Sequence, residues 1–234
     1  VDRARIEVVV RKNLVEALRD IAFEVALVGP RTHDTAPHAA VDRARTSSPP
    51  GLLDDASPAQ ALALGLLADK RRQALERAFR LLQIAHRAED LRGVFSALGS
   101  KDGRLRAQAL EFLDALTSVT SRERNAKPEV VETRADVREL LRLLGDDLQD
   151  EERVARGARF LGAAPKTREE ALAMLIDDRD ETLATVAAYY ALELDDQGLL
   201  KRVDAALVKR PTLPVASSLE RAPASIRFPQ VAHG

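Results

Sequence analysis

The stretch LGSKDGRLRAQALEFLDAL, Leu98–Leu116, contains a glycine-rich turn with a lysine in it, and residues of these types can hold a phosphate. A Walker-type phosphate loop has the order Gly-x-x-x-x-Gly-Lys-Ser/Thr and usually follows a strand. Here the order is Gly-Ser-Lys-Asp-Gly, no strand pattern precedes it, and Asp102 would repel a phosphate. We therefore predict that Gly99–Gly103 is the corner between two helices.

The histidines and the absence of cysteine leave little for a metal centre. His33 and His38 lie near Asp34 in a segment without helical periodicity, which gives metal ligands no fixed geometry. His86 falls at the end of a predicted helix, where we expect it to bond local carbonyls, and His233 is next to the last residue. With no Cys, disulfides and thiolate metal sites are excluded. We predict no metal and no cofactor.

Three of the four Asp-Asp doublets, all in the second half of the chain, raise the hypothesis of calcium binding. The sequence after Asp178 lacks the glycine at the sixth position and the glutamate at the twelfth that an EF-hand loop requires. Each doublet lies where a predicted helix ends or begins, so we interpret these aspartates as helix caps. The doublets are Asp146-Asp147, Asp177-Asp178 and Asp195-Asp196.

Nucleophilic catalysis finds no support in the motifs. The chain has no Gly-x-Ser-x-Gly elbow and no Cys nucleophile, so we predict that it is not an enzyme.

Tyr189-Tyr190 lies within residues 136–200, which carry twice as many acidic as basic side chains and would repel nucleic-acid phosphates. We expect this pair to pack within a helix, with one ring at the surface.

The composition favours a helical core of small and branched aliphatic residues. Of the 234 residues, 45% are hydrophobic and 31% charged, while aromatic residues make up 3% and Trp is absent. The formal net charge of -1 creates no overall field toward nucleic acid or an anionic membrane. The longest apolar run, Ala61–Ala68, is far shorter than the roughly 18 residues of a membrane span.

The beginning of the chain has no signal-peptide shape, and we expect a cytoplasmic location. It lacks Met and starts directly on a helical pattern, so we also expect the chain to be a piece of a longer protein.

Apolar residues recur at helical spacing over most of the chain, and no alternating run of strand length appears, which predicts an all-α fold. Ser57-Pro58-Ala59-Gln60 has the order of a capping box, as does Thr167-Arg168-Glu169-Glu170. We predict helices near 3–28, 58–86, 88–98, 103–118, 135–144, 151–161, 167–176, 181–193 and 196–209, with a polar connection over 119–133.

The corner at Gly99–Gly103 has two counterparts downstream, after Leu144 and after Leu175. In the helix after each corner an apolar residue is followed four positions later by Ala, and the small Ala would let two helix axes approach closely. These pairs are Leu105 and Ala109, Val154 and Ala158, and Leu183 and Ala187. Helix pairs that repeat in this way are expected to stack into a solenoid. We predict an N-terminal helix over 1–29, a flexible linker over 30–57, a HEAT-like helical-hairpin solenoid over 58–210 and an irregular tail over 211–234.

Several motifs in residues 66–116 carry a family resemblance. They are Glu-Arg-x-Phe-Arg-Leu-Leu at Glu76–Leu82, Glu89-Asp90, Leu-x-Ser-x-Asp at Leu98–Asp102, and Leu-Arg-Ala-x-Ala-Leu-Glu-x-Leu-Asp at Leu105–Asp114. This region resembles the HEAT-like segment attached to some bacterial ATP:ADP translocase-type nucleotide transporters, although Gln108 and Ala115 stand where that family often has Asn. The resemblance implies a soluble cytosolic module beside, or belonging to, a membrane protein, and it carries over no transport residue.

We predict a non-catalytic protein-interaction or regulatory module with a protein partner, and no nucleic acid as a ligand. Arginines between 71 and 87 form a basic stripe, which is either a solvated face or a surface for an acidic partner. The residues predicted to bind a partner are Arg77, Arg80, Arg104, Arg106 and Tyr189. Two alternatives stay open: a nucleic-acid-acting HEAT-like enzyme of the DNA glycosylase type, and a packing module that rigidifies a larger protein.

Overall fold

The computed structural model describes residues 2–29, 57–118 and 128–210. Within these ranges the chain forms ten helices and no strand, so the predicted all-α class is confirmed. The predicted tail and all of the predicted linker except Ser57 lie outside the described residues. The helices are α1 (Arg3–Val28), α2 (Pro58–Ala85), α3 (Leu91–Leu98), α4 (Gly103–Thr117), α5 (Pro128–Gly145), α6 (Asp150–Arg156), α7 (Ala158–Leu161), α8 (Arg168–Ile176), α9 (Glu181–Leu194) and α10 (Gln197–Lys209).

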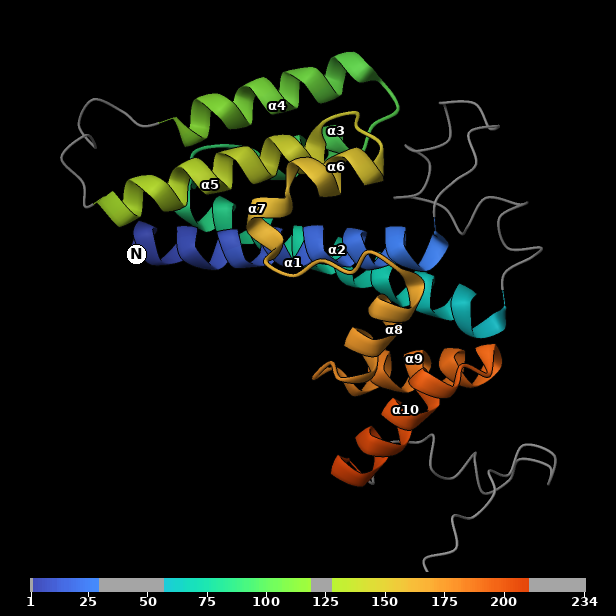
Figure 1. Cartoon of the computed structure of the whole chain (residues 1–234). Coiled ribbons are helices and arrows are strands. Elements are labelled where there is room, and N and C mark those ends of the chain that lie inside the picture. The colour runs from blue at the N-terminus through green and yellow to red at the C-terminus, as the bar shows by residue number, and fades with distance from the viewer. Residues whose placement is uncertain (1, 30–56, 119–127, 211–234) are drawn as a thin grey trace, which may run out of the picture.

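The two longest helices, α1 and α2, lie side by side and antiparallel through the middle of the molecule (Figure 1). Ser57 caps α2 as predicted, because its hydroxyl accepts a hydrogen bond from the backbone N–H of Gln60 at 3.2 Å. The side-chain amide of Gln60 donates to the backbone carbonyl of Leu27 at 3.1 Å, and this hydrogen bond joins the end of α1 to the start of α2. At the opposite end, Nη2 of Arg3 lies 3.3 Å from Nε2 of His86. The side chain of His86 therefore contacts a second helix, α1, whereas the sequence led us to expect hydrogen bonds to carbonyls of its own helix end.

Two hydrophobic cores lie along this helix pair. The first, which we call the α3–α7 core, takes in the first two-thirds of α1, the second half of α2, and α3 to α5, with partly buried side chains of α7 at its edge. Its fully buried leucines are Leu14, Leu18, Leu82, Leu91, Leu113 and Leu140. Because α1 supplies two of these six leucines, the helices on this side depend on α1 for their packing.

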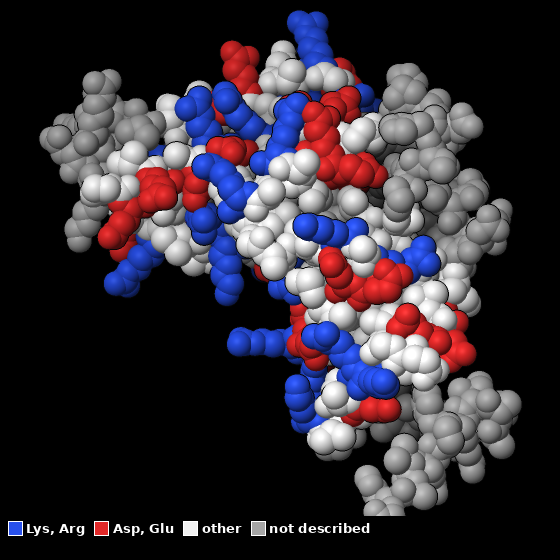
Figure 2. Space-filling view, viewed as in Figure 1, with Lys and Arg blue, Asp and Glu red and all other residues white. Residues whose placement is uncertain are grey.

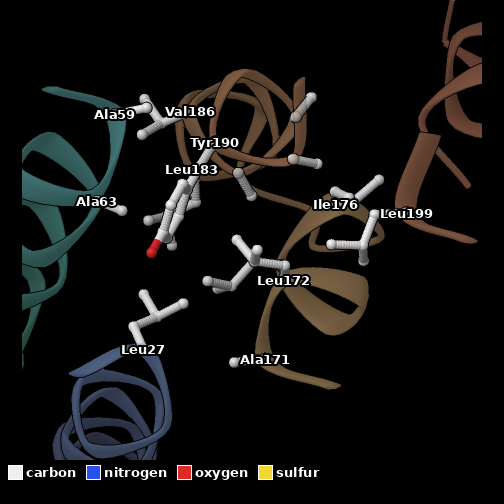
Figure 3. Close-up of a cluster of buried hydrophobic side chains, with 14 of the residues drawn as sticks. Leu27, Ala59, Ala63, Ala171, Leu172, Ile176, Leu183, Val186, Tyr190 and Leu199 are labelled. Atoms are coloured by element: carbon white, nitrogen blue, oxygen red, sulfur yellow. The ribbon is translucent and has the colours of Figure 1, made fainter. Parts of the chain in front are cut away.

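The second core, the α8–α10 core, lies at the other end of the pair (Figures 1 and 3). Leu27 of α1 and Ala63 of α2 face Tyr190 of α9, whose ring is 1% exposed. Leu172 and Ile176 of α8 fill the space toward α10. Residues 1–29, predicted as an N-terminal helix before the linker, contain α1, which contributes buried side chains to both cores.

A buried ion pair joins α1 to α5 inside this arrangement. Glu7 and Arg134 are 4% and 6% exposed, and the guanidinium donates to both carboxylate oxygens, at 3.0 and 3.2 Å. Arg3 donates to the same carboxylate at 3.1 Å. Charges removed from water in this way are tolerated only when each is fully paired, so the two helices are held in one register.

Two predicted boundaries were wrong. Helix α5 begins at Pro128, earlier than expected, because a proline in the first helical turn has no N–H to leave unsatisfied. The predicted helix over 151–161 is divided at Gly157 into α6 and α7. A Cβ added at Gly157 would lie 2.5 Å from Cδ2 of Leu18 and 2.8 Å from Cδ2 of Leu143, so the chain passes too close to α1 and α5 for any side chain.

The apolar–Ala pattern used to predict the hairpins holds in one of its three places. Leu183 and Ala187 are both buried, as expected. In the first pair Leu105 is 45% exposed, although Ala109 is buried. In the second pair Ala158 is exposed, because Gly157, and not Ala158, is the small residue that packs against α1 and α5. Small residues do mark helix contacts here, but the sequence pattern does not identify which small residue makes each one.

Substitution of Gly157 by Ala is expected to destabilise the protein by about 1–3 kcal/mol, because the added methyl group overpacks against two leucines. The control is Gly65→Ala in the exposed interior of α2, where an added Cβ meets nothing within 4 Å. That change is expected to stabilise the helix by up to about 1 kcal/mol. Urea denaturation followed by circular dichroism measures both, and equal effects of the two substitutions would contradict the close approach.

Replacement of Arg134 by Met is expected to cost about 3 kcal/mol or more, because it leaves the Glu7 carboxylate buried without its main partner. The double variant Glu7→Leu/Arg134→Met removes both charges and should recover most of the loss. A double-mutant cycle from urea denaturation gives the coupling energy, and a value below about 0.5 kcal/mol would show that the pair does not hold the helices together.

Candidate functional site

The described surface has a shallow groove between the antiparallel helices α3 and α4, which we call the α3–α4 groove. It consists of two overlapping hollows of about 340 and 330 Å³. The lining residues are Asp90, Gly93, Val94, Ser96, Ala97 and Ser100 on the α3 side and Leu105, Gln108, Ala109 and Phe112 on α4. The residues that line it are mainly small or apolar, so the groove is suited to an apolar surface.

Two aspartates fix the helices that form the groove. Asp90 caps α3 by accepting from the N–H of Gly93 at 3.0 Å, and Asp102 caps α4 by accepting from the N–H of Arg104 at 2.8 Å. Gly93 suits its place because an added Cβ would lie 2.6 Å from the Asp90 carboxylate in its capping position. The turn before α4 is the helix corner predicted from the sequence, and its Ser100 accepts from the N–H of Asp102 at 3.1 Å.

The arginines predicted to bind a partner lie on two helices and differ in their surroundings. On α2, Arg77 donates to Asn13 at 2.9 Å and pairs with Glu16 at 3.4 Å, while Arg80 pairs with Glu76 in the same helix. These contacts occupy both guanidinium groups on the α2 surface.

The two arginines of α4 also differ from each other. Arg106 is largely buried and donates to the carbonyl of Ser100 at 2.8 Å and to Asp147 at 3.1 Å, so it fastens the corner before α4 to the loop after α5. Arg104 is exposed, and its side chain forms no ion pair with the described residues. The structure thus leaves Arg104 the most available of the four predicted arginines.

The tyrosine pair packs into the helical fold. Tyr189 is half-buried against the α8–α10 core, and Tyr190 is fully buried in it. Burial raises the pKa of the Tyr190 phenol, whose oxygen has no hydrogen-bond partner among the described residues. The pair is therefore not a stacking platform, and Tyr189 lies on a different helix from the predicted arginines.

Aspartates of the three doublets, and Asp180 beside the second of them, act as helix caps or form ion pairs between helices. Asp180 caps α9 by accepting from the N–H groups of Thr182 and Leu183 at 2.9 and 3.1 Å, and Asp196 caps α10. Asp180 also pairs with Lys70 of α2, and the nearby Asp178 pairs with Arg19 of α1; Asp177 pairs with Arg202 of α10 at 2.7 Å. The turn between α8 and α9 is therefore tied to three other helices.

One buried acid was missed by the sequence analysis. Asp20 of α1 is 4% exposed, and its Oδ2 has no hydrogen-bond partner among the described residues. Burial raises its pKa to about 7, and the neighbouring carboxylates of Glu16 and Glu24 contribute to the rise. The sequence signal that could have revealed the site is the four-residue spacing of these three acids, which places them on one face of the helix. Three like charges on one face repel one another unless another helix supplies cations.

Charges of both signs alternate over the face shown in Figure 2, so no single-sign patch dominates it. Among the described residues, no group of three or more His, Cys, Asp or Glu side chains is arranged to hold a metal ion. None of the helices in the described ranges is both long and apolar enough to cross a membrane.

Comparisons of the chain with known proteins identified no related protein. No protein-family model matches the chain, and no match was found among curated proteins or among solved structures.

Replacement of Asp20 by Asn is expected to stabilise the protein at pH 8 and to change the pH dependence of its stability. The folded carboxyl binds a proton more tightly than the unfolded one, whose pKa is near 3.8, so wild-type stability falls as pH rises from about 4 to about 7. The shift corresponds to at most about 4 kcal/mol. Asp180, whose pKa is lowered chiefly by the hydrogen bond from Lys70, affects stability in the opposite direction and only below its ordinary range.

The measurement is the free energy of unfolding in urea at pH 4.5, 6 and 8 for the wild type and Asp20→Asn. The difference between them should be largest at pH 8 and should shrink as pH is lowered. Parallel pH profiles for the two proteins would show that Asp20 does not titrate in this range.

Proposed function

We propose that this chain is a non-catalytic interaction module that binds an amphipathic helix of a partner protein in the α3–α4 groove. The observation that carries the proposal is Leu105, a groove-lining leucine that is 45% exposed beside the small residues Ala97 and Ala109. A leucine in this position gives a partner side chain an apolar contact at one wall, while the small residues leave room for it.

The length of the groove fits a short helical segment. Helix α3 has eight residues, which corresponds to about 12 Å along its axis. Two turns of a partner helix span about the same distance, with apolar anchors at positions i, i+3 or i+4, and i+7.

Charge favours an acidic partner. Arg92 lies one turn before the groove residue Ser96 on α3, and Arg104 lies one turn before Gln108 on α4. Both arginines are exposed, and neither side chain forms an ion pair with the described residues. Asp90 and Asp102, each two residues before one of these arginines, are engaged as helix caps. A partner helix with Asp or Glu beside its apolar stripe would therefore meet unpaired cations at both walls.

A HEAT-like stacking of hairpins is part of this proposal. Each helix from α2 to α5 packs on the next one along the chain, which is the neighbour-to-neighbour contact of helical repeats. The motifs that resemble the HEAT-like segments of translocase-type transporters fall in α2, in the turns before and after α3, and in α4, and so include one helix of the groove and both ends of the other. A module of this kind, attached to a membrane protein, would present the groove to a soluble partner.

The nucleic-acid alternative has less support. Arg77 and Arg106 are engaged in contacts between helices, and the ring of Tyr190 is buried. A protein of the DNA glycosylase type needs exposed cations along a groove and aromatic rings that reach the bases.

The proposal is tested with two synthetic fluorescent helical peptides that share a leucine stripe and differ in their flanking residues, Glu in one and Lys in the other. We expect saturable binding of the Glu peptide in fluorescence anisotropy and weaker binding of the Lys peptide. Leu105→Asp should reduce the affinity about tenfold or more, since it places a charge in the apolar contact. The matched control, Leu62→Asp, changes a leucine that is 54% exposed on α2 outside the groove and should have no effect.

Equal loss with both variants, or no binding of either peptide, would contradict the assigned site. Tight binding of duplex DNA that falls steeply with salt would favour the nucleic-acid alternative instead.

A further inference from the structure

Four ion pairs surround Asp20 where α1, α2 and the α8–α9 turn meet. Two of them join α1 to α2: Arg71 with Glu24 at 2.9 Å, and Arg77 with Glu16 at 3.4 Å. The other two join this helix pair to the turn: Arg19 with Asp178, and Lys70 with Asp180. Each of these four carboxylates is therefore in contact with a cation.

Asp20 is the fifth carboxyl group of this junction, and no fifth cation is paired with it in the part of the chain that the structure describes. On its own helix Glu16, Arg19 and Glu24 are near, and from α2 the near charge is Lys70. Both neighbouring cations are already paired with aspartates of the turn. The junction is electrically balanced only while Asp20 is protonated, and ionisation leaves one buried negative charge without a counter-ion.

Ionised Asp20 would compete for the cations that hold the turn. Lys70 has a flexible stem and donates from an ammonium group that can turn toward a second carboxylate. Its present partner, Asp180, is also the cap of α9, so the same carboxylate holds both the lysine and the first turn of that helix. Loss of Lys70 from Asp180 would loosen the contact between α2 and the start of α9.

We propose that Asp20 is the proton-controlled part of a latch: when protonated it leaves Lys70 and Arg19 to hold the α8–α9 turn against α1 and α2, and when ionised it draws them away. Because burial raises the pKa of Asp20 to about 7, the change falls in the range of ordinary cellular pH. The latch does not depend on the α3–α4 groove or its occupant.

The loosening is confined to one side of the turn. On the other side, Arg210 donates to the carbonyls of Asp178 and Ile176 at 2.6 and 2.9 Å, and Arg202 pairs with Asp177. None of these contacts uses the cations near Asp20. The apolar side chains of the α8–α10 core also keep α8 and α9 on the helix pair. The expected change is local opening of residues 178–184, with the helices retained.

The test is hydrogen exchange of the full chain at pH 6 and pH 8.5, with rates corrected for intrinsic exchange. In the wild type, protection of amides in 178–184 should fall about tenfold at the higher pH, the size of a lost charge-assisted contact. Amides of α4, in 103–117, should keep their protection. Asp20→Asn cannot ionise and should show the same protection of the turn at both values.

A second variant separates the latch from a general effect of pH. Lys70→Met removes one of the two cations for which Asp20 competes, so its turn should be more open at pH 6 than the wild-type turn and should respond less to pH. If the wild type and Asp20→Asn lose protection in parallel, or if Lys70→Met keeps the wild-type response, the latch is wrong.

Discussion

Helix α1 has to be buried on several sides at once, and the rest of the structure depends on this constraint. It packs against α2 along its length and also against α5, α6 and α8. The α3–α7 core contains Leu14 and Leu18, and the α8–α10 core contains Phe23 and Leu27. Neither core is complete without these side chains, so α1, together with α2, couples two groups of helices that have no contiguous core in common.

Three polar side chains of α1, those of Glu7, Asn13 and Asp20, are buried, and each of them needs a hydrogen-bond partner. Glu7 obtains two arginines, and the Asn13 side chain donates to a backbone carbonyl and accepts from Arg77. Asp20 is the exception, since one of its carboxyl oxygens has no hydrogen-bond partner among the described residues. Its raised pKa follows from this: where no cation is supplied, the neutral form is favoured.

The arginines show how the fold limits the surface that is left for binding. Two arginines of the predicted basic stripe, Arg71 and Arg77, lie between helices, as do Arg106 and Arg134 outside the stripe. What remains for a partner is apolar contact at the α3–α4 groove with exposed cations beside it. This arrangement is the reason for a protein helix, and not a nucleic acid, as the proposed ligand.

Local features of the fold could be predicted from the sequence, since they depend on residues close together in the chain. The start of α2 at Ser57 and the corner at Asp102 are examples, because a side chain and an amide two or three residues away determine them.

The division at Gly157 could not be predicted, because its cause is the approach of Leu18 and Leu143 from distant segments. For the same reason the exposure of Leu105, which defines the groove, and the burial of Asp20 required the structure. A helical period indicates that a residue lies on one face, but not which helices cover that face.

The dependence of both cores on α1 is tested most directly by Leu14→Ala with two probes of urea unfolding. Leu14 is fully buried in the α3–α7 core, whereas both tyrosines of the chain lie in α9, so tyrosine fluorescence reports the α8–α10 core and circular dichroism reports all helices. The account predicts that the substitution, which should cost about 2–5 kcal/mol, lowers both midpoints together. A tyrosine transition that stays at the wild-type midpoint while the helical signal shifts would contradict it.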